Sequence, residues 1–154
     1  MKATIQVDTR EKNNNHILSV FEDNKIMCLS SKLPFGDYMN LDNPRLVVER
    51  KNSICELATS LCKDHIRFRS ELKNAQSYGI HIILLIENNN GFTSVEDLKK
   101  WINPFHKKNP HAVSGEKLYK ILVSMQNHYC FDIEFTSKAA AGSRIIQLLK
   151  TDYH

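Results

Sequence analysis

Residues 80–87 read IHIILLIE, and this segment constrains the fold more than any other part of the chain. It is apolar, rich in β-branched residues, and short for a helix, so it predicts a strand. A strand that is apolar along its whole length is typical of the centre of a sheet covered on both faces. The run is also far shorter than the roughly 20 residues that a membrane span requires. We therefore expect no membrane partner.

Strand-like and helical patterns alternate along the rest of the chain. Asp42, Asn43 and Pro44 form a turn signal that predicts a β-hairpin on either side. Ser53, with Glu56 three residues later, is a helix-capping pattern. We expect strands at residues 3–8, 26–29, 35–41, 45–51, 80–87 and 131–135, and helical segments at 16–22, 53–79, 94–102, 114–128 and 138–150. This order predicts an α/β fold in which helices cover a mixed sheet.

Length and composition exclude several classes of protein. With 154 residues and 42% hydrophobic residues, the chain is expected to form a single domain, residues 1–154, with a substantial core. Its four cysteines are widely spaced, so free thiols are expected rather than disulfides or a structural zinc site. The charged N-terminus has no apolar signal-peptide region, which predicts a cytoplasmic protein. The net charge of +4 is compatible with nucleic acid but equally with ordinary solvated helix faces.

Acidic residues and a lysine follow the predicted hairpin strands in a pattern that suits metal-assisted phosphodiester hydrolysis. Glu49 and Lys51 share one face of a strand because side chains alternate with a period of two. Asp37 comes from the hairpin partner. Two carboxylates can bind Mg²⁺ or Mn²⁺ through oxygen, and a lysine can stabilise an anionic transition state. On spacing alone, an ordinary charged strand edge explains the pattern equally well.

The literal residues resemble a known family. Gly36-Asp37 followed by Glu49-Arg50-Lys51 is similar to the GD…ERK signature of the XPF-type structure-specific endonucleases, and Asp8-Thr9-Arg10-Glu11 resembles that family's VDxRE start. The resemblance implies a restriction-endonuclease-like three-layer α/β/α fold and Mg²⁺- or Mn²⁺-dependent cleavage of branched, flapped or junction DNA that leaves a 5′-phosphate and a 3′-hydroxyl. It also implies the site: catalytic Asp8, Asp37, Glu49 and Lys51, with Asp37 and Glu49 as metal ligands and Arg10, Glu11, Arg50 and Glu56 at the rim.

Two departures from the family pattern leave an alternative open. The aspartate usually found four residues after the ERK lysine is Cys55 here, and its neighbour Glu56 is the available substitute. The chain is also as short as the stand-alone forms found in phages, which would act in the host cytoplasm in recombination, repair or replication. A catalytically inactive DNA-binding domain, or a dimer partner of the same fold, is the second hypothesis. The resemblance also implies a homodimer.

Several further residues carry weaker expectations. Basic residues on predicted helices and loops are candidates for contact with DNA phosphates, namely Arg67, Arg69, Lys107, Lys108 and Lys117. Trp101 and Phe105 could stack on an unpaired base, although Trp101 is more readily explained as a core residue. Glu87 resembles a family glutamate, but we expect it to be a structural partner of Arg50 or Arg67. The apolar residues of the last two helices are expected to cover the sheet rather than to form a dimer interface.

Overall fold

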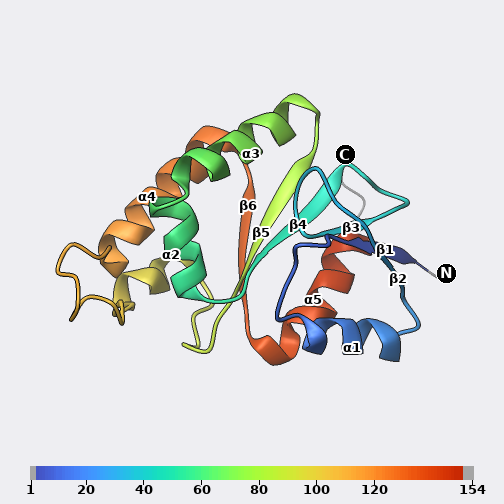
Figure 1. Ribbon diagram of the computed structural model, residues 1–154, viewed down its shortest axis with the longest axis horizontal. Helices are drawn as coiled ribbons and strands as arrows, with labels where there is room; N and C mark the ends of the chain where they lie inside the picture. Colours follow the sequence, from blue (N-terminus) through green and yellow to red (C-terminus); the bar gives the residue numbers. More distant parts are fainter. Residues whose placement is uncertain (1–2, 151–154) are drawn as a thin grey trace.

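The computed structural model describes residues 3–150 and contains one six-stranded sheet with helices on both faces (Figure 1). The strands are ordered β2-β1-β3-β4-β5-β6 across the sheet. They are β1 (Thr4–Val7), β2 (Met27–Ser30), β3 (Tyr38–Asn40), β4 (Leu46–Lys51), β5 (His81–Glu87) and β6 (Asp132–Thr136). Strand β3 runs antiparallel to β1 and β4, and the other neighbouring pairs are parallel. The predicted three-layer α/β/α class is confirmed.

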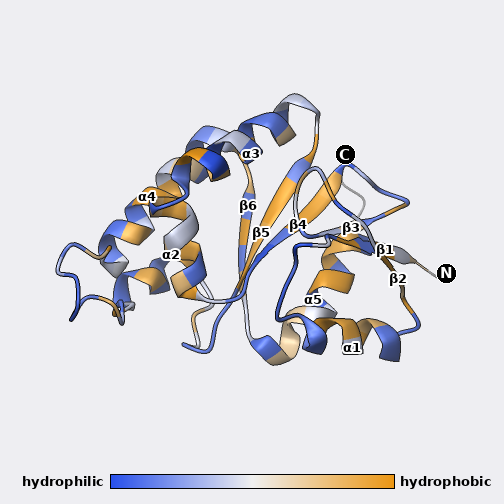
Figure 2. Cartoon of the chain, viewed as in Figure 1, coloured by the Kyte–Doolittle hydropathy of each residue, from blue (hydrophilic) through white to orange (hydrophobic). Residues whose placement is uncertain are grey.

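The helices divide between the two faces of the sheet. They are α1 (Asn15–Asp23), α2 (Ile54–Cys62), α3 (His65–Ser77), the 3₁₀ helix η1 (Val95–Lys100), α4 (Gly115–Tyr129) and α5 (Lys138–Lys150). One core cluster lies between the sheet and α2, α3 and α4, and the other between the sheet and α1 and α5. Figure 2 shows the apolar residues along β4 and β5 and on the helix α5. Strand β5 is central and buried, as its sequence predicts.

Alternation along β4 assigns its residues to the two layers. Val47 belongs to the cluster under α2 and α3, whereas Leu46 and Val48 belong to the cluster under α1 and α5. Glu49 and Lys51 therefore continue the first face, and Arg50 continues the second. The ammonium of Lys51 lies 5.2 Å from the ring centroid of Phe68 on α3, which agrees with this assignment.

The helical segment expected at residues 53–79 is broken into two helices. Asp64 N–H donates to the carbonyl of Thr59, and His65 Nδ1 lies 2.8 Å from the carbonyl oxygen of Cys62. These contacts end α2 and start α3 in a new direction. In one continuous helix, the periodic pattern of apolar residues would include Ile66 together with Leu61 and Phe68, but Ile66 is 73% exposed. The segment expected at 94–102 is also different, because it forms the short 3₁₀ helix η1 rather than an α-helix.

Other expectations hold among residues 3–150. All four cysteines are free thiols, and Trp101 is buried in the core. The apolar residues of α4 and α5 are buried under the sheet, so they cover it as expected: Leu118, Leu122, Ile145, Ile146 and Leu149. No helix in this part of the chain is long and apolar enough to cross a membrane.

Candidate nuclease active site

The β3–β4 hairpin holds the predicted catalytic residues in place. Asp37 immediately precedes β3, and its N–H donates to the carbonyl of Val48 at 2.8 Å. Its own Oδ2 accepts a hydrogen bond of 2.8 Å from the backbone N–H of Arg50. Lys51 Nζ lies 3.2 Å from Oε1 of Glu49. The hairpin therefore brings Asp37, Glu49 and Lys51 together at the C-terminal end of β4, as the sequence predicts.

These residues line an open polar cavity of about 580 Å³. Every residue proposed from the sequence for the catalytic centre and its rim lines it. Carboxylates outnumber cations along its wall, although the chain as a whole is positively charged. The charged residues of the lining are Asp8, Arg10, Glu11, Lys12, Asp37, Glu49, Arg50, Lys51, Glu56, Asp64, Arg67 and Glu71. A cleft lined mainly by carboxyl groups favours the binding of a cation, which can displace their protons.

The surroundings of Asp37 and Glu49 disfavour the ionised forms of both side chains. Burial, followed by the nearby charge of Glu11, raises the pKa of Asp37 to about 8. Burial, followed by the charges of Asp37 and Glu71, raises the pKa of Glu49 well above its usual value. A nearby cation favours the ionised form of a carboxyl group, so a divalent ion between these groups would lower both pKa values. The donor set thus fits a hard cation.

Lys51 is held as a charged ammonium group. Burial alone would lower its pKa, but the carboxylates of Glu49 and Asp37 raise it above the usual value. Only 9% of the side chain is exposed. Because it is protonated at neutral pH, Lys51 can donate hydrogen bonds to an anion but cannot accept a proton.

The sequence reasoning missed Glu71, which reaches the cavity from α3. Its Oε1 accepts a hydrogen bond of 3.1 Å from the backbone N–H of Gly36, directly before Asp37. The signal was available in the spacing, because Glu71 follows the buried Phe68 by three residues and so lies on the same side of the helix. A polar residue on the inner face of a helix is a candidate for a site.

The structure shows where Cys55 and its neighbour Glu56 lie relative to the cavity. Cys55 packs against the core cluster and does not line the cavity, whereas Glu56 does. The backbone N–H of Glu56 donates to Ser53 Oγ at 3.0 Å, which is the predicted helix cap. Its carboxylate accepts from the N–H of Asn52 at 3.2 Å, one residue after Lys51. Glu56 therefore supplies a carboxylate to the cavity from the first turn of α2.

Asp8 lines the cavity, but its carboxylate is occupied by structural contacts. Its Oδ1 accepts from the N–H of Leu33 and its Oδ2 from Nε of Arg10, both at 2.8 Å. Burial would raise the pKa of Asp8, but these hydrogen bonds, with that of Arg10 first, lower it below the usual value. Within this structure Asp8 ties the end of β1 to the segment before Asp37, so it contributes to the shape of the wall.

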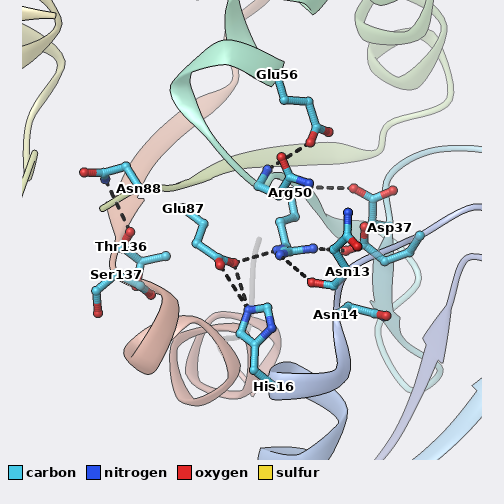
Figure 3. Close-up of polar contacts among 12 residues, drawn as sticks. Asn13, Asn14, His16, Asp37, Arg50, Glu56, Glu87, Asn88, Thr136 and Ser137 are labelled. Carbon is cyan, nitrogen blue, oxygen red and sulfur yellow. Dashed lines mark hydrogen bonds and ion pairs between the residues drawn. The ribbon is translucent and has the colours of Figure 1, made fainter. Parts of the chain in front are cut away.

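Arg50 connects the site to the opposite layer. Its Nε donates to Glu87 at 2.8 Å, Nη1 to Glu11 at 3.2 Å, and Nη2 to the carbonyl of Asn13 at 3.1 Å (Figure 3). His16 Nε2 lies 3.1 Å from the Glu87 carboxylate. The guanidinium thus fixes residues 11–13, which form part of the cavity wall, against the end of β5. The expectation that Glu87 is a structural partner of Arg50 is confirmed.

The basic residues predicted to contact DNA lie in different surroundings. Arg67 lines the cavity, whereas Arg69, Lys107, Lys108 and Lys117 are exposed and lie outside it. Lys117, in the first turn of α4, is close enough to the Cys62 thiol at the end of α2 to oppose the increase in pKa that burial causes. The role of these residues in binding DNA remains a prediction.

No group of three or more His, Cys, Asp or Glu side chains in residues 3–150 is arranged as a ready metal site. Asp37, Glu49 and Glu71 all line the cavity, and its lining contains neither His nor Cys. Mg²⁺ and Mn²⁺ prefer carboxylate oxygens as ligands, whereas zinc is usually bound by imidazole or thiolate groups. The residues present therefore fit these ions in chemistry.

Comparisons with known proteins identify the family and the fold of the chain. The family model described as the ERCC4 domain matches residues 7–149. The structure is similar to XPF from Aeropyrum pernix in complex with DNA, with a TM-score of 0.69 and 20% identity over 97% of this chain and 64% of that one. XPF from Aeropyrum pernix alone gives a TM-score of 0.67 and 18% identity over 96% and 63% of the two chains.

The chain therefore spans slightly less than two thirds of these XPF chains, and the likeness shows a shared fold. No curated protein sequence matches it. The family model, in contrast, covers most of the chain and includes every residue of the hairpin site and Glu71. On this sequence match and on the fold, the chain belongs to the ERCC4 domain family.

Proposed function

We propose that this protein is a metal-dependent endonuclease that hydrolyses phosphodiester bonds in branched, flapped or junction DNA. The observation that supports it most strongly is that the β3–β4 hairpin brings Asp37, Glu49 and Lys51 together in one carboxylate-rich cavity. Membership of the ERCC4 domain family supports the same activity. One of the similar structures, XPF from Aeropyrum pernix, is a complex with DNA, which supports DNA as the substrate class.

Asp37 and Glu49 would hold the metal ion. The hydrogen bond from Arg50 N–H to Oδ2 fixes the orientation of the Asp37 carboxylate and leaves lone pairs for a cation. When bound, Mg²⁺ or Mn²⁺ would acidify a water molecule and neutralise charge that develops on the phosphate. Glu56 and Glu71 line the same cavity and would accept hydrogen bonds from water there. Four carboxylates are therefore available, so Cys55 no longer favours an inactive domain.

Lys51 would stabilise the phosphate as it is attacked. Its ammonium group stays protonated because Glu49 and Asp37 raise its pKa. A fixed cation in a cleft stabilises the additional negative charge of the transition state more than the charge of the substrate. Lys51 therefore acts on the phosphate and not as the general base.

Exposed cations would guide DNA to the cavity. Arg67 lies on the cavity wall, and Lys117 lies near the end of α2, on the side where α4 packs. Lys107 and Lys108 lie on the loop that precedes α4. Each phosphate that is neutralised releases counterions, so binding should weaken steeply with added salt. A homodimer would need a surface other than the buried apolar faces of α4 and α5.

Gel-resolved cleavage of labelled flap, fork, four-way and plain duplex DNA tests this function. Reactions contain Mg²⁺, Mn²⁺ or EDTA and use the wild type, Asp37→Asn and Lys51→Met. Lys51→Met keeps an unbranched side chain of similar length and removes the ammonium group that lies over Phe68. Asp42→Asn, in an exposed turn, is the matched control.

We expect metal-dependent cuts by the wild type and the control, and losses of at least 100-fold in the two site variants. The variants should still bind DNA in EDTA. Binding by the wild type without cleavage in either metal would contradict the proposal and support a DNA-binding partner domain.

A further inference from the structure

The loop between η1 and α4 displays two large apolar side chains to solvent. Ile102 is 86% exposed and Phe105 is 59% exposed, whereas the preceding Trp101 is buried. Figure 1 shows this loop extending from the end of the molecule that carries η1 and α4. Single exposed apolar residues are common on protein surfaces, but two within four residues on one loop are a candidate contact surface.

The base of this loop is fixed by packing and hydrogen bonds. Asn103 is only 9% exposed, and its Nδ2 donates to the carbonyl of Val113 at 2.9 Å, across the loop. Its Oδ1 accepts from the N–H of Phe105 at 3.0 Å. Gly115 approaches η1 so closely that a Cβ there would lie 2.6 Å from the carbonyl oxygen of Trp101. The loop is therefore held in a shape that keeps Phe105 outside the core.

The charged residues of the loop itself are all basic. Between Asp97 and Glu116 the sequence contains four lysines and no carboxylate. Lys99 stacks on Tyr119 and Lys100 pairs with Asp97, but neither Lys107 nor Lys108 makes an ion pair within residues 3–150. A patch that combines apolar tips with unpaired cations is complementary to nucleic acid, whose phosphates are anionic and whose base faces are apolar.

This chemistry favours unpaired bases over a continuous duplex. In a stacked duplex the face of each base is covered by its neighbours, so an exposed aromatic ring has no base face to contact. At a fork or flap, the unpaired strand leaves base faces open. We propose that Ile102 and Phe105 stack against unpaired bases next to the branch point, while Lys107 and Lys108 hold the adjoining phosphates.

This inference rests on the proposed function and adds to it, because it names the part of a branched substrate that the loop contacts. It assigns recognition of single-stranded DNA to a surface separate from the catalytic cavity. The loop is connected to that cavity through α4, which packs against α2 near Cys62 and Lys117.

Fluorescence anisotropy in EDTA tests the inference without cleavage. The probes are a labelled fork with single-stranded arms and a blunt duplex of the same length. The variants are Phe105→Ser and Phe105→Trp, with Met27→Ser on β2 as the matched control because Met27 is 62% exposed. A fork that carries 2-aminopurine in its unpaired arm reports stacking directly.

We expect Phe105→Ser to bind the fork about tenfold more weakly and the duplex within twofold of wild type. Phe105→Trp should keep fork binding, Met27→Ser should match wild type, and 2-aminopurine quenching should be lost only in Phe105→Ser. Equal binding of the fork by Phe105→Ser and wild type would overturn the inference and leave the proposed nuclease intact. A change in the oligomeric mass of Phe105→Ser, measured by light scattering, without a change in fork binding would also overturn the inference. The loop would then be a protein interface. Failure of the wild type to bind either DNA would overturn both proposals.

Discussion

Replacement of Gly36 by alanine should destabilise the fold and distort the catalytic wall together. Gly36 has φ of +74°, and a Cβ at this position would lie 2.8 Å from Cβ and 2.9 Å from Cγ2 of Val47. The left-handed conformation costs an alanine about 1–2 kcal/mol relative to glycine. Forced contacts in a packed core cost about 1–3 kcal/mol more. The expected loss in the free energy of unfolding is therefore about 2–5 kcal/mol.

Gly79 provides a control that separates the two costs. Its φ is +70°, almost the same as that of Gly36, but a Cβ there would have no heavy atom within 4 Å. Gly79→Ala should therefore lose only the conformational part, about 1–2 kcal/mol. Urea unfolding followed by circular dichroism measures both variants under the same conditions. The slope of free energy against urea should be unchanged, since neither variant alters the surface exposed on unfolding.

The difference between the two variants isolates the contact with Val47. Gly36→Ala should also weaken activity, because Gly36 N–H donates to Glu71 and Gly36 directly precedes Asp37 in the chain. Gly79→Ala should retain wild-type cleavage once the temperature is below its unfolding transition. Equal destabilisation by the two substitutions would refute the reasoning, because it would show that the close approach to Val47 carries no energy.

Four further outcomes are expected. Arg50→Met should lower the free energy of unfolding by about 3–5 kcal/mol, measured by urea unfolding, because the buried carboxylate of Glu87 loses its guanidinium partner; a loss below 1 kcal/mol would contradict this. Because the pKa of Asp37 is raised in the folded state to about 8, metal-free protein should lose stability as pH rises from about 4 through about 8, and thermal scans should show Mg²⁺ stabilising it more at pH 8 than at pH 6; stability that rises over this range would contradict the prediction. Glu71→Gln should unfold at a higher temperature without metal yet bind Mn²⁺ more weakly by calorimetry, since it removes a repelling charge from the cavity; unchanged Mn²⁺ affinity would show that the charge is not felt by the ion. Cys55→Asp should not raise cleavage rates and should destabilise the fold by about 1–3 kcal/mol, because position 55 packs against the core; a gain in activity would mean that this side chain can reach the cavity.

The sequence was sufficient for the positions of the strands along the chain and for the hairpin that holds Asp37, Glu49 and Lys51, because both depend on local signals. The apolar run of β5 and the turn at Asp42–Pro44 have few alternative structures, and the alternation of β4 alone places Glu49 and Lys51 on one face. The helix cap at Ser53 was also predictable, since it needs only the spacing to Glu56.

Other features depend on packing that no local pattern reports. The break between α2 and α3 follows no proline or glycine, and it arises from hydrogen bonds of Asp64 and His65 to the end of α2. Without that break the face that contains Ile66 was misassigned. Glu71 was missed because charged residues on helices are usually exposed, and only the direction of α3 brings this one to Gly36.

The face assignment of β4 has a consequence for how the sheet avoids misfolded alternatives. From Ile82 to Ile86 strand β5 is apolar on both faces, so by itself it would accept a neighbour shifted by one residue. Such a shift would turn Glu49 and Lys51 toward α1 and α5, and would separate Arg50 from Glu87. Buried charges without partners cost several kcal/mol, so the shifted pairing is strongly disfavoured. The three charged residues that serve the site therefore also specify the register in which the centre of the sheet assembles.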